Sequence, residues 1–424
     1  MTSPAPRDAG TAVAAAPDQA ADPVAAPAAD LVAALVPHPA DGPLAAARAE
    51  RPDAVLGTQD TYRALFDPGA ALTTLTPAER LAAALRVAVL HTAGPATGRL
   101  AGHYRAQLAA LGADPVLVDA AGSTGFGPGD ARTAALLGHA TLLALEPLAA
   151  TEGHQQALAD AGLTPDEVVT LSQVAAYVSY QARLVHGLSL LAEAADGSEA
   201  TDEPGAAAGP AGALGVRVPG VPPALPHGAE LPSGEIPFTF DVLDWDPWVP
   251  PVDPQAATGP QQAGLAAAPD ASWPYFRLLA RDPEVLRHRT RTDRGIFRSP
   301  GGLPRAEREL AATVASRLNG CVFCASVHSR LAARLSGREA EVERLFGGRF
   351  DGFEGRWADV VAFAARLSTS APTASAADLE RLRGHGLSVL EQLDLVQATA
   401  FFAWANRLML TLGRVRRPVP GEAS

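Results

Sequence analysis

Residues 309–328 read ELAATVASRLNGCVFCASVH and contain both cysteines of this 424-residue chain. Cys321 and Cys324 stand in C-x-x-C spacing, and His328 follows the second cysteine by four residues. Outside the disulfide frameworks of small secreted proteins, such a pair is typical of redox-active thiols. The stretch therefore predicts two helices joined by a turn, with thiol chemistry at that turn.

The turn decides where the first cysteine lies. Asn319-Gly320 is a helix-stop signal, so Cys321 falls at or near the N-terminus of the following helix. The macrodipole and the free backbone N–H groups of a helix N-terminus favour a thiolate. An ordinary cysteine, with a pKa of ~8.5, is mostly protonated at pH 7, so this placement would activate the thiol.

A proton relay can be built from the same stretch. Cys324 and His328 are four residues apart and are therefore neighbours on one helix face, where the histidine can accept or relay the thiol proton. Glu309, in the preceding helix, can orient that histidine, which gives a carboxylate–imidazole–thiol relay. Helix geometry favours Cys324 as the attacking thiol and Cys321 as the thiol that then closes a disulfide.

The composition indicates an all-α protein. Hydrophobic residues make up 47% of the chain, much of it alanine, and aromatic residues only 5%; alanine and leucine are strong helix formers. The net charge of −12 argues against a general nucleic-acid binder, which needs a basic surface.

No segment of the sequence predicts contact with a membrane. The most apolar stretch, residues 81–90, is shorter than the ~18 residues of a membrane helix and is interrupted by Arg86. The N-terminus lacks the basic and apolar regions of a signal peptide. We therefore expect a cytoplasmic protein.

An internal repeat organises the chain. Segment 75–80 (LTPAER) lines up with 303–308 (LPRAER), 100–105 with 325–330, and 171–177 with 395–401, in the same order and at nearly constant offset. In this alignment Leu81 stands opposite Glu309, His103 stands opposite His328, and the cysteines have no counterparts. The repeat predicts two tandem copies of one helical domain, of which only the second has the thiol chemistry.

Four parts of the chain follow from this organisation. Residues 1–28 are rich in Ala and Pro and are expected to be disordered. The first helical copy, without the redox motif, occupies 29–194, and a Pro/Gly/Ala-rich linker occupies 195–234. The second copy occupies 235–424 and begins with an extended arm over 235–260, which we expect to pack across a domain or a neighbouring subunit.

The same residues resemble a known family. Glu309, eleven residues, the Cys321–Cys324 pair, three residues and His328 are similar to the E-x11-C-x-x-C-x3-H signature of the AhpD-like alkylhydroperoxidases, within the carboxymuconolactone decarboxylase superfamily. Segments 303–319, 386–388 and 406–408 also resemble that family. The resemblance covers about 270–413 and, more weakly, about 31–193 as a cysteine-free copy.

The resemblance implies an all-helical fold and a trimeric or hexameric homo-oligomer. It implies thiol-dependent reduction of organic hydroperoxides, with Cys324, Cys321, His328 and Glu309 as the catalytic residues and no cofactor beyond the cysteine pair. Electrons would come from an external dithiol or a lipoyl-type protein. One departure stands out: the family has a further histidine between the cysteines, where this chain has Phe323.

Other interpretations of the motif stay open. The cysteine pair could be inert, or half of a metal site, but zinc needs about four ligands and His328 with two cysteines leaves the set short. A carboxymuconolactone decarboxylase-type enzyme would use His328 and Glu309 as acid and base without the thiols. A redox-switched assembly protein would use the cysteine pair as a sensor without turnover.

Residues outside the motif favour structural roles. His103 lacks a thiol or carboxylate partner, so we expect a satisfied core histidine. The arginines at positions 287, 289, 291, 294 and 298 are expected to form a solvated face rather than a docking surface. Phe401, Phe402 and Trp404 would line a substrate pocket or a subunit interface, and plain core packing explains them equally well.

Overall fold

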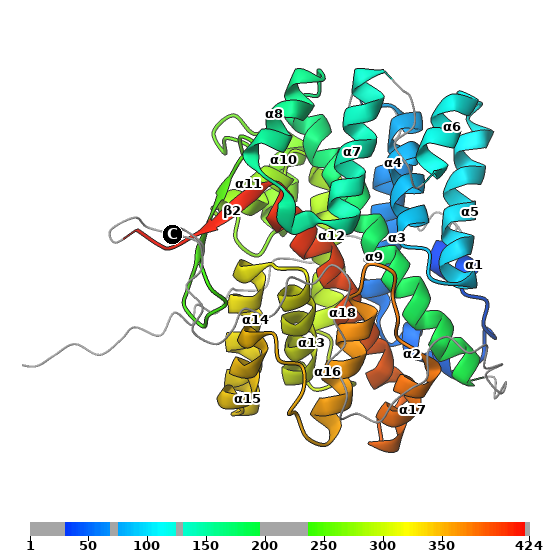
Figure 1. The fold of residues 1–424 in the computed structure, drawn as a ribbon, viewed down its shortest axis with the longest axis vertical. Coiled ribbons are helices and arrows are strands. Elements are labelled where there is room, and N and C mark those ends of the chain that lie inside the picture. Colours follow the sequence, from blue (N-terminus) through cyan, green and yellow to red (C-terminus); the bar gives the residue numbers. More distant parts are fainter. Residues whose placement is uncertain (1–29, 68–74, 124–129, 196–235, 420–424) are drawn as a thin grey trace, which may run out of the picture.

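The computed structural model describes residues 30–67, 75–123, 130–195 and 236–419 (Figure 1). The predicted disordered tail (1–28) and the predicted linker (195–234, apart from residue 195) lie outside these described residues. Within them the chain forms eighteen α-helices, two short 3-10 helices and one two-stranded sheet. The prediction of an all-α fold is confirmed. No described helix is long and apolar enough to cross a membrane.

The helices of the first half precede residue 196. They are α1 Leu31–Leu35, α2 Pro43–Ala49, α3 Pro52–Phe66, α4 Pro77–Leu90, α5 Pro95–Ala110, α6 Pro115–Gly122, α7 Ala131–Leu145, α8 Glu152–Asp160 and α9 Pro165–Ala195, with the 3-10 helix η1 at Pro147–Ala149. At the start of α4, Thr76 and Glu79 form a capping box around a proline at the first helical position.

The second half begins with an irregular segment and a short strand. Its elements are β1 Asp244–Pro247, α10 Gly259–Ala267, α11 Pro274–Leu279, α12 Pro283–Phe297, α13 Arg305–Leu318, α14 Val322–Ser336, α15 Glu339–Glu343, the 3-10 helix η2 Arg344–Gly347, α16 Arg356–Leu367, α17 Ala376–Gly384, α18 Val389–Thr411 and β2 Gly413–Arg416. The helix α10 was not foreseen, because its run of Gly, Ala and Gln has little apolar periodicity.

Helices α3–α9 and α12–α18 follow each other in the same order. Helices α3 and α12 both have 15 residues, α4 and α13 both have 14, and α8 and α17 both have 9. The first residues of α9 and α18 lie at 165 and 389, and those of α4 and α13 at 77 and 305, which keeps the offset nearly constant. This order supports the interpretation of two copies of one domain, which stays a prediction.

The same ion pairs also recur in the two halves. In each half one arginine bridges two glutamates that lie in the first turns of two helices: Arg132 with Glu79 and Glu167, and Arg356 with Glu307 and Glu391. A carboxylate in a first helical turn also complements the helix dipole. In each half this bridge joins the long C-terminal helix, α9 or α18, to an earlier helix, α4 or α13. The recurrence supports the interpretation that the halves share one scaffold.

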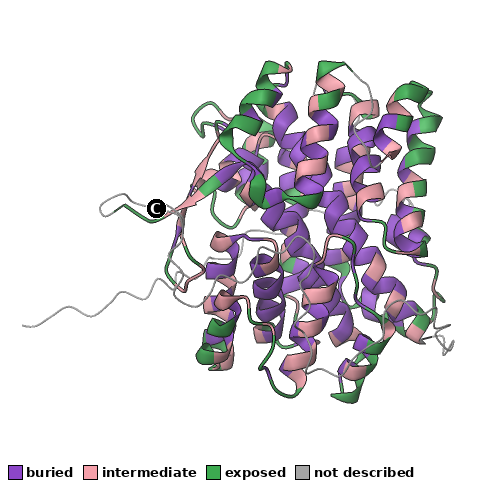
Figure 2. Ribbon diagram, in the orientation of Figure 1, coloured by how far each residue is buried: buried purple, intermediate pink, exposed green. Residues whose placement is uncertain are grey.

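The halves pack together through their equivalent helices, α9 on α18 and α3 on α12. Figure 1 shows α9 and α18 crossing at the centre of the molecule, and Figure 2 shows that this centre is buried. The contacts are reciprocal: Arg183 of α9 donates to the carbonyl of Thr369 at 2.8 Å, and Arg407 of α18 donates to the carbonyl of Ala144 at 3.0 Å. The chain therefore resembles a dimer folded into one polypeptide.

The predicted extended arm covers the second half. Its strand β1 pairs antiparallel with β2, with Trp245 opposite Val415, and the indole of Trp245 donates to the carbonyl of Met409 at 2.9 Å. Ahead of the strand, the ring of Phe238 lies 4.3 Å from the guanidinium carbon of Arg317. The arm is thus attached to α13 and α18, the helices that carry the site described below.

Candidate active site

Glu309 and His328 meet across the helix pair α13 and α14. Glu309 lies in the first two turns of α13 and is 1% exposed, and its Oε2 is 2.6 Å from Nδ1 of His328. Arg305, one turn earlier on α13, donates to the other carboxylate oxygen at 3.1 Å. The carboxylate therefore fixes one ring nitrogen of His328 and leaves Nε2 for a reacting group.

The cysteines lie where the two helices join. Gly320 has φ +79°, so it ends the turn in a left-handed conformation that favours glycine, and Cys321 is the N-cap of α14. Cys324 follows in the first turn. Both thiols are free and buried. The predicted helix stop and the predicted place of Cys321 are confirmed.

The first half closes over this turn. A Cβ built on Gly320 would lie 2.8 Å from Cδ2 of Leu148, so glycine is required by close approach as well as by its backbone angle. Leu148 belongs to η1, between α7 and α8. A residue of the half without cysteines therefore forms part of the wall beside Cys321.

The two thiols differ in acidity, and in the opposite sense to the helix-terminus argument. Burial raises the pKa of Cys321 well above its usual value, and its hydrogen bond with Cys324 adds to this. The pKa of Cys324 is lowered, first by the hydrogen bond from Cys321, against the effect of burial, and then by His328, Asn406 and Arg289. The helix-terminus argument favoured a thiolate on Cys321, whereas the spacing of Cys324 and His328 favoured Cys324 as the attacking thiol. The directions of the two pKa shifts agree with the second argument, because hydrogen bonds and charges around Cys324 outweigh the effect of the helix terminus.

The carboxylate and the imidazole favour their charged forms. Burial alone would raise the pKa of Glu309, but the hydrogen bond and charge of His328, with those of Arg305, lower it. Burial alone would lower the pKa of His328, but Glu309 and the nearby Cys324 raise it. Both shifts act toward a protonated His328 beside an ionised Cys324.

Asparagines that the motif analysis did not select also reach the site. Asn406 of α18 lies beside both cysteines and acts to lower the pKa of each thiol. Its amide is held by Asn319, which donates to Asn406 Oδ1 at 3.0 Å, and it donates to Ser316 Oγ at 3.1 Å. Asn406 stands in the segment 406–408 that resembles the family, which was the one available signal for it.

Aromatic rings surround the relay. The ring of Phe402, in α18, lies 4.4 Å from that of His328 in an edge-on arrangement. The ring of Phe297, in α12, lies 6.0 Å from that of His328. Phe323 faces away from these rings and stacks on Trp273 at 5.0 Å with an interplanar angle of 22°. The position that holds a histidine in the resembling family thus serves packing here.

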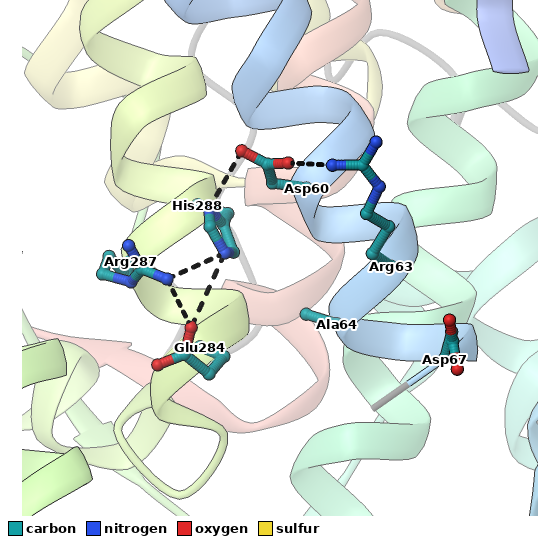
Figure 3. A pocket seen from close by; sticks show the side chains of 7 residues that line it. All are labelled: Asp60, Arg63, Ala64, Asp67, Glu284, Arg287 and His288. Atoms are coloured by element: carbon teal, nitrogen blue, oxygen red, sulfur yellow. Dashed lines mark hydrogen bonds and ion pairs between the residues drawn. The ribbon is translucent and has the colours of Figure 1, made fainter. Parts of the chain in front are cut away.

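One surface pocket lies beside the site, and another lies at a distance from it. One, of ≈ 430 Å³, is lined by residues 297–299, 301–305 and 308 and so includes Phe297 and Arg305, which contact His328 and Glu309. The other, of ≈ 450 Å³, lies between α3 and α12 and is lined by charged residues that pair with one another, as Asp60 does with Arg63 (Figure 3). The lining of the second pocket contains none of the residues that contact the Glu309–His328 pair, whereas that of the first contains Arg305, which donates to Glu309.

His103 and His328 differ in their distance from the start of their helices. His103 lies eight residues after Pro95, the first residue of α5, whereas His328 lies six residues after Val322, the first residue of α14. The predicted alignment of the two histidines therefore requires a shift of two residues between the helix starts, and it stays a prediction. The Nε2 atom of His103 is 2.8 Å from the hydroxyl of Tyr62. The prediction of a satisfied histidine is confirmed, although its side chain is half-buried.

The arginines of α12 are not all on a solvated face. Arg287 and Arg291 pair with acidic residues at the surface, as predicted, but Arg289 is 6% exposed and lies on buried aromatic rings. Phe401, Phe402 and Trp404 are buried in the core between the halves. Among the described residues, no group of three or more His, Cys, Asp or Glu side chains is arranged to hold a metal ion.

Comparison with known proteins adds a family match. Residues 283–366 match the carboxymuconolactone decarboxylase family, which confirms the superfamily resemblance for a segment that spans α12–α16. Among solved structures, an uncharacterized peroxidase-related protein from Silicibacter sp. TM1040 is similar, with 27% identity over 32% of this chain and 74% of that one and a TM-score of 0.30. No curated protein matches the chain.

Proposed function

We propose that this chain, whose residues 283–366 match the carboxymuconolactone decarboxylase family, is a thiol-dependent peroxidase that reduces organic hydroperoxides. The observation that supports this most directly is the contact of 2.6 Å between Glu309 and His328, one helical turn from Cys324. A general acid must be held within reach of the reacting atoms, and a peroxide-cleaving thiol must be ionised. The Glu309–His328 contact and the lowered pKa of Cys324 support both conditions at one place.

The reaction begins at Cys324. Its thiolate attacks the terminal oxygen of the hydroperoxide, the S–O bond forms as the O–O bond breaks, and the alkoxide leaves as an alcohol with a proton from His328. Glu309 stabilises the charged form of His328 before the transfer. The sulfur of Cys324 is oxidised by two electrons to a sulfenic acid, and the hydroperoxide is reduced to alcohol.

Resolution uses the second cysteine. The thiol of Cys321 attacks the sulfenic sulfur of Cys324, a disulfide forms, and water leaves with the thiol proton. An external dithiol, such as a lipoyl-type protein, then reduces the disulfide by thiol exchange. The buried position of Cys321 and its raised pKa suit a thiol that stays protonated until this step. We further propose that the chain works as a homo-oligomer, a trimer or hexamer.

Stopped-flow oxidation tests the proposal. Reduced protein is mixed with an organic hydroperoxide, the rate of peroxide loss is followed, and free thiols are counted afterwards. We expect both thiols to be lost at a rate well above that of a free thiol, with one alcohol formed per disulfide. If Cys324→Ser and Cys321→Ser variants both consumed peroxide as fast as the wild type, the mechanism would be wrong.

The same experiment separates the alternatives. A decarboxylase or lactone-processing enzyme would act without added dithiol and would keep its activity when both cysteines are serine. A redox-switched assembly protein would change its oligomeric state on oxidation but would show negligible turnover of peroxide. Added dithiol, the double serine variant and the oligomeric state before and after oxidation are therefore measured together.

A further inference from the structure

Among the described residues, Arg289 is the one buried arginine without a polar partner. Nine arginines are buried there, and eight of them have hydrogen bonds to carboxylates, carbonyls or a hydroxyl. Arg289 is 6% exposed and has neither a hydrogen bond nor an ion pair within the described residues, and its Nε is unsatisfied.

A buried cation without a hydrogen-bonded partner is costly, so its retention indicates an anion nearby. Asp293, on the same helix as Arg289, is one such anion, because the charge of Arg289 acts to lower its pKa, although no hydrogen bond joins the two. The Cys324 thiolate is the other: the ring of Phe401 under Arg289 lies 5.9 Å from that of Phe402, which lies 4.4 Å from that of His328.

Aromatic rings hold the guanidinium without giving it an acceptor. Its carbon lies 5.7 Å from the ring of Tyr275, 5.1 Å from that of Phe401 and 5.8 Å from that of Trp404. Cation–π contacts of this kind favour the charge but satisfy no N–H group. The hydroxyl of Tyr275, which is 3% exposed, is also without a hydrogen-bond partner in the described chain. Two buried donors thus lie together in need of an acceptor.

The first half fixes this arrangement. The indole of Trp404 donates to Gln173 Oε1 at 2.8 Å, and Tyr180 stacks on Trp404 with the ring centroids 5.7 Å apart. Both partners of Trp404 belong to α9, so the half without cysteines fixes the orientation of the Trp404 ring that Arg289 contacts.

The charged groups around Cys324 come from four elements. The helix α14 contributes His328, with Cys321 as its N-cap. The helix α12 contributes Arg289 and Asp293, α11 contributes Tyr275, and α13 contributes Glu309 through His328. The helix α18 contributes a neutral group, the amide of Asn406. Of these groups, only Arg289 is a cation whose charge does not depend on pH in the ordinary range.

The first half lacks this cation together with the cysteines. Counted from the first residues of α3 and α12, Thr58 stands where Arg289 stands, and its hydroxyl is 2.8 Å from that of Tyr180. Tyr180 in turn stands where Trp404 stands in α18. The equivalent place is therefore filled by a neutral hydrogen-bonded pair in the half that has no thiol.

We propose that Arg289 is the permanent cationic partner of the Cys324 thiolate, held on aromatic rings that the first half positions. The inference deepens the proposed function, because the peroxidase mechanism needs a thiolate, but it concerns ionisation alone and is measured without peroxide. It leaves His328 as the proton donor and assigns to Arg289 the stabilisation of the charge on sulfur.

The test measures the pH dependence of alkylation of Cys324. The Cys321→Ser background leaves a single thiol and keeps a hydroxyl donor beside it. Rates with neutral iodoacetamide and with anionic iodoacetate are followed from pH 5 to pH 10, and mass spectrometry confirms the modified residue. In this background we compare Arg289→Met, Arg289→Lys and the matched control Arg317→Met, another buried arginine that lies on an aromatic ring.

We expect Arg289→Met to move the alkylation midpoint upward by about one pH unit, so that both reagents react about tenfold more slowly below the midpoint. Arg289→Lys should restore most of the rate, and Arg317→Met should keep the midpoint of the background. An unchanged midpoint in folded Arg289→Met would overturn the proposal. So would a loss confined to iodoacetate, because the guanidinium would then attract an anionic reagent rather than stabilise sulfur.

Folding is checked by thermal melting, and Arg289→Gln, a neutral residue that can still hydrogen-bond, is a second variant should Arg289→Met fail to fold. The same two results, a shifted or an unshifted midpoint, then decide the matter. A wild-type protein that alkylates readily at low pH yet consumes no hydroperoxide would refute the proposed peroxidase and leave the role of Arg289 intact.

Discussion

Helices α4 and α5 of the first half have 14 and 16 residues, and α13 and α14 of the second half have 14 and 15. Counted from their first residues, Leu81 stands where Glu309 stands, and Thr97 stands where Cys324 stands. Leu81 packs in the core of the first half, and Thr97 hydrogen-bonds the backbone at the start of α5. The same helix pair therefore folds with or without a relay.

The two halves share structural features but differ in the chemical groups that they contain. Both keep an arginine that bridges two first-turn glutamates, and both keep the long helix at the centre. Among the described residues, only the second half has a buried carboxylate that pairs with a histidine of its own half, a thiol pair and a buried arginine without a polar partner. Since the first half folds without these groups, packing alone does not require them, which supports the proposal that they serve chemistry. The predictions below use residues of one half as controls for the other.

The largest effect is expected for Cys324→Ser. A serine hydroxyl is not ionised at neutral pH and cannot form a sulfenic acid, so hydroperoxide consumption should fall to the background rate. Turnover is measured with excess dithiol. The matched control is Thr97→Ser, which keeps the hydroxyl that bonds the backbone at the start of α5. Equal losses in the two variants would mean that the fold, not the thiol, was affected.

Glu309→Gln should lower turnover by about 100-fold, the size of a lost general acid–base contribution. The amide keeps the shape of the carboxylate but removes the charge that favours protonated His328. The same substitution two residues earlier, Glu307→Gln, removes a carboxylate that pairs with Arg356 and does not contact the relay. We expect that control to keep wild-type turnover; a comparable loss there would point to disruption of α13.

The pH profile should distinguish the two charges. The rate rises with pH as Cys324 loses its proton, a limb shifted to lower pH because the pKa of this thiol is lowered. It falls again as His328 loses its proton, a limb shifted to higher pH because the pKa of this imidazole is raised. In Glu309→Gln the alkaline limb should move to lower pH, whereas the acid limb should move little. A profile with no alkaline limb would exclude His328 as the acid.

A smaller and symmetric effect is expected for the bridging arginines. Arg132→Met and Arg356→Met should each lower the free energy of unfolding by about 1–2 kcal/mol, since both side chains are half-buried and their ion pairs are partly screened. Urea unfolding measures this. Alkylation of Cys324 should be unchanged in both variants. A loss several times larger in one half would contradict the shared scaffold.

The smallest effect on turnover is expected for Phe323→His. The ring loses its stack on Trp273, which should cost about 0.5–1.5 kcal/mol of stability, while turnover should change by less than about threefold. Phe323→Tyr is the control, because it keeps the stacked ring. A large gain in turnover from the histidine would show that the family's extra relay residue is missing from this chain rather than replaced.

The sequence allowed much of the fold to be predicted, and for local reasons. Helix starts could be read from caps such as Thr76 and Ser388 and stops from Gly320, because capping and left-handed glycine are properties of a few neighbouring residues. The helix α10 was missed because short runs of Gly and Ala have no strong period.

The site was predicted only where its spacing lies along the chain. The i, i+4 relation of Cys324 and His328 is a helical property, and Glu309 came from the family signature. The roles of Arg289 and Asn406 could not be predicted, because α12 and α18 reach the cysteines only through packing. The same holds for Leu148, which lies about 170 residues from the turn it closes on.

By itself the sequence determined an all-helical chain, a repeated order of helices and a thiol pair with a histidine on one helix face. Tertiary structure alone decided which thiol is the more acidic, since the helix terminus favours Cys321 whereas its burial and the hydrogen bonds and charges around Cys324 favour the latter. It also decided that the half without cysteines supports the site of the other. The physical reason is that propensity and capping act within a few residues, whereas burial and charge sum over every element that packs around a group.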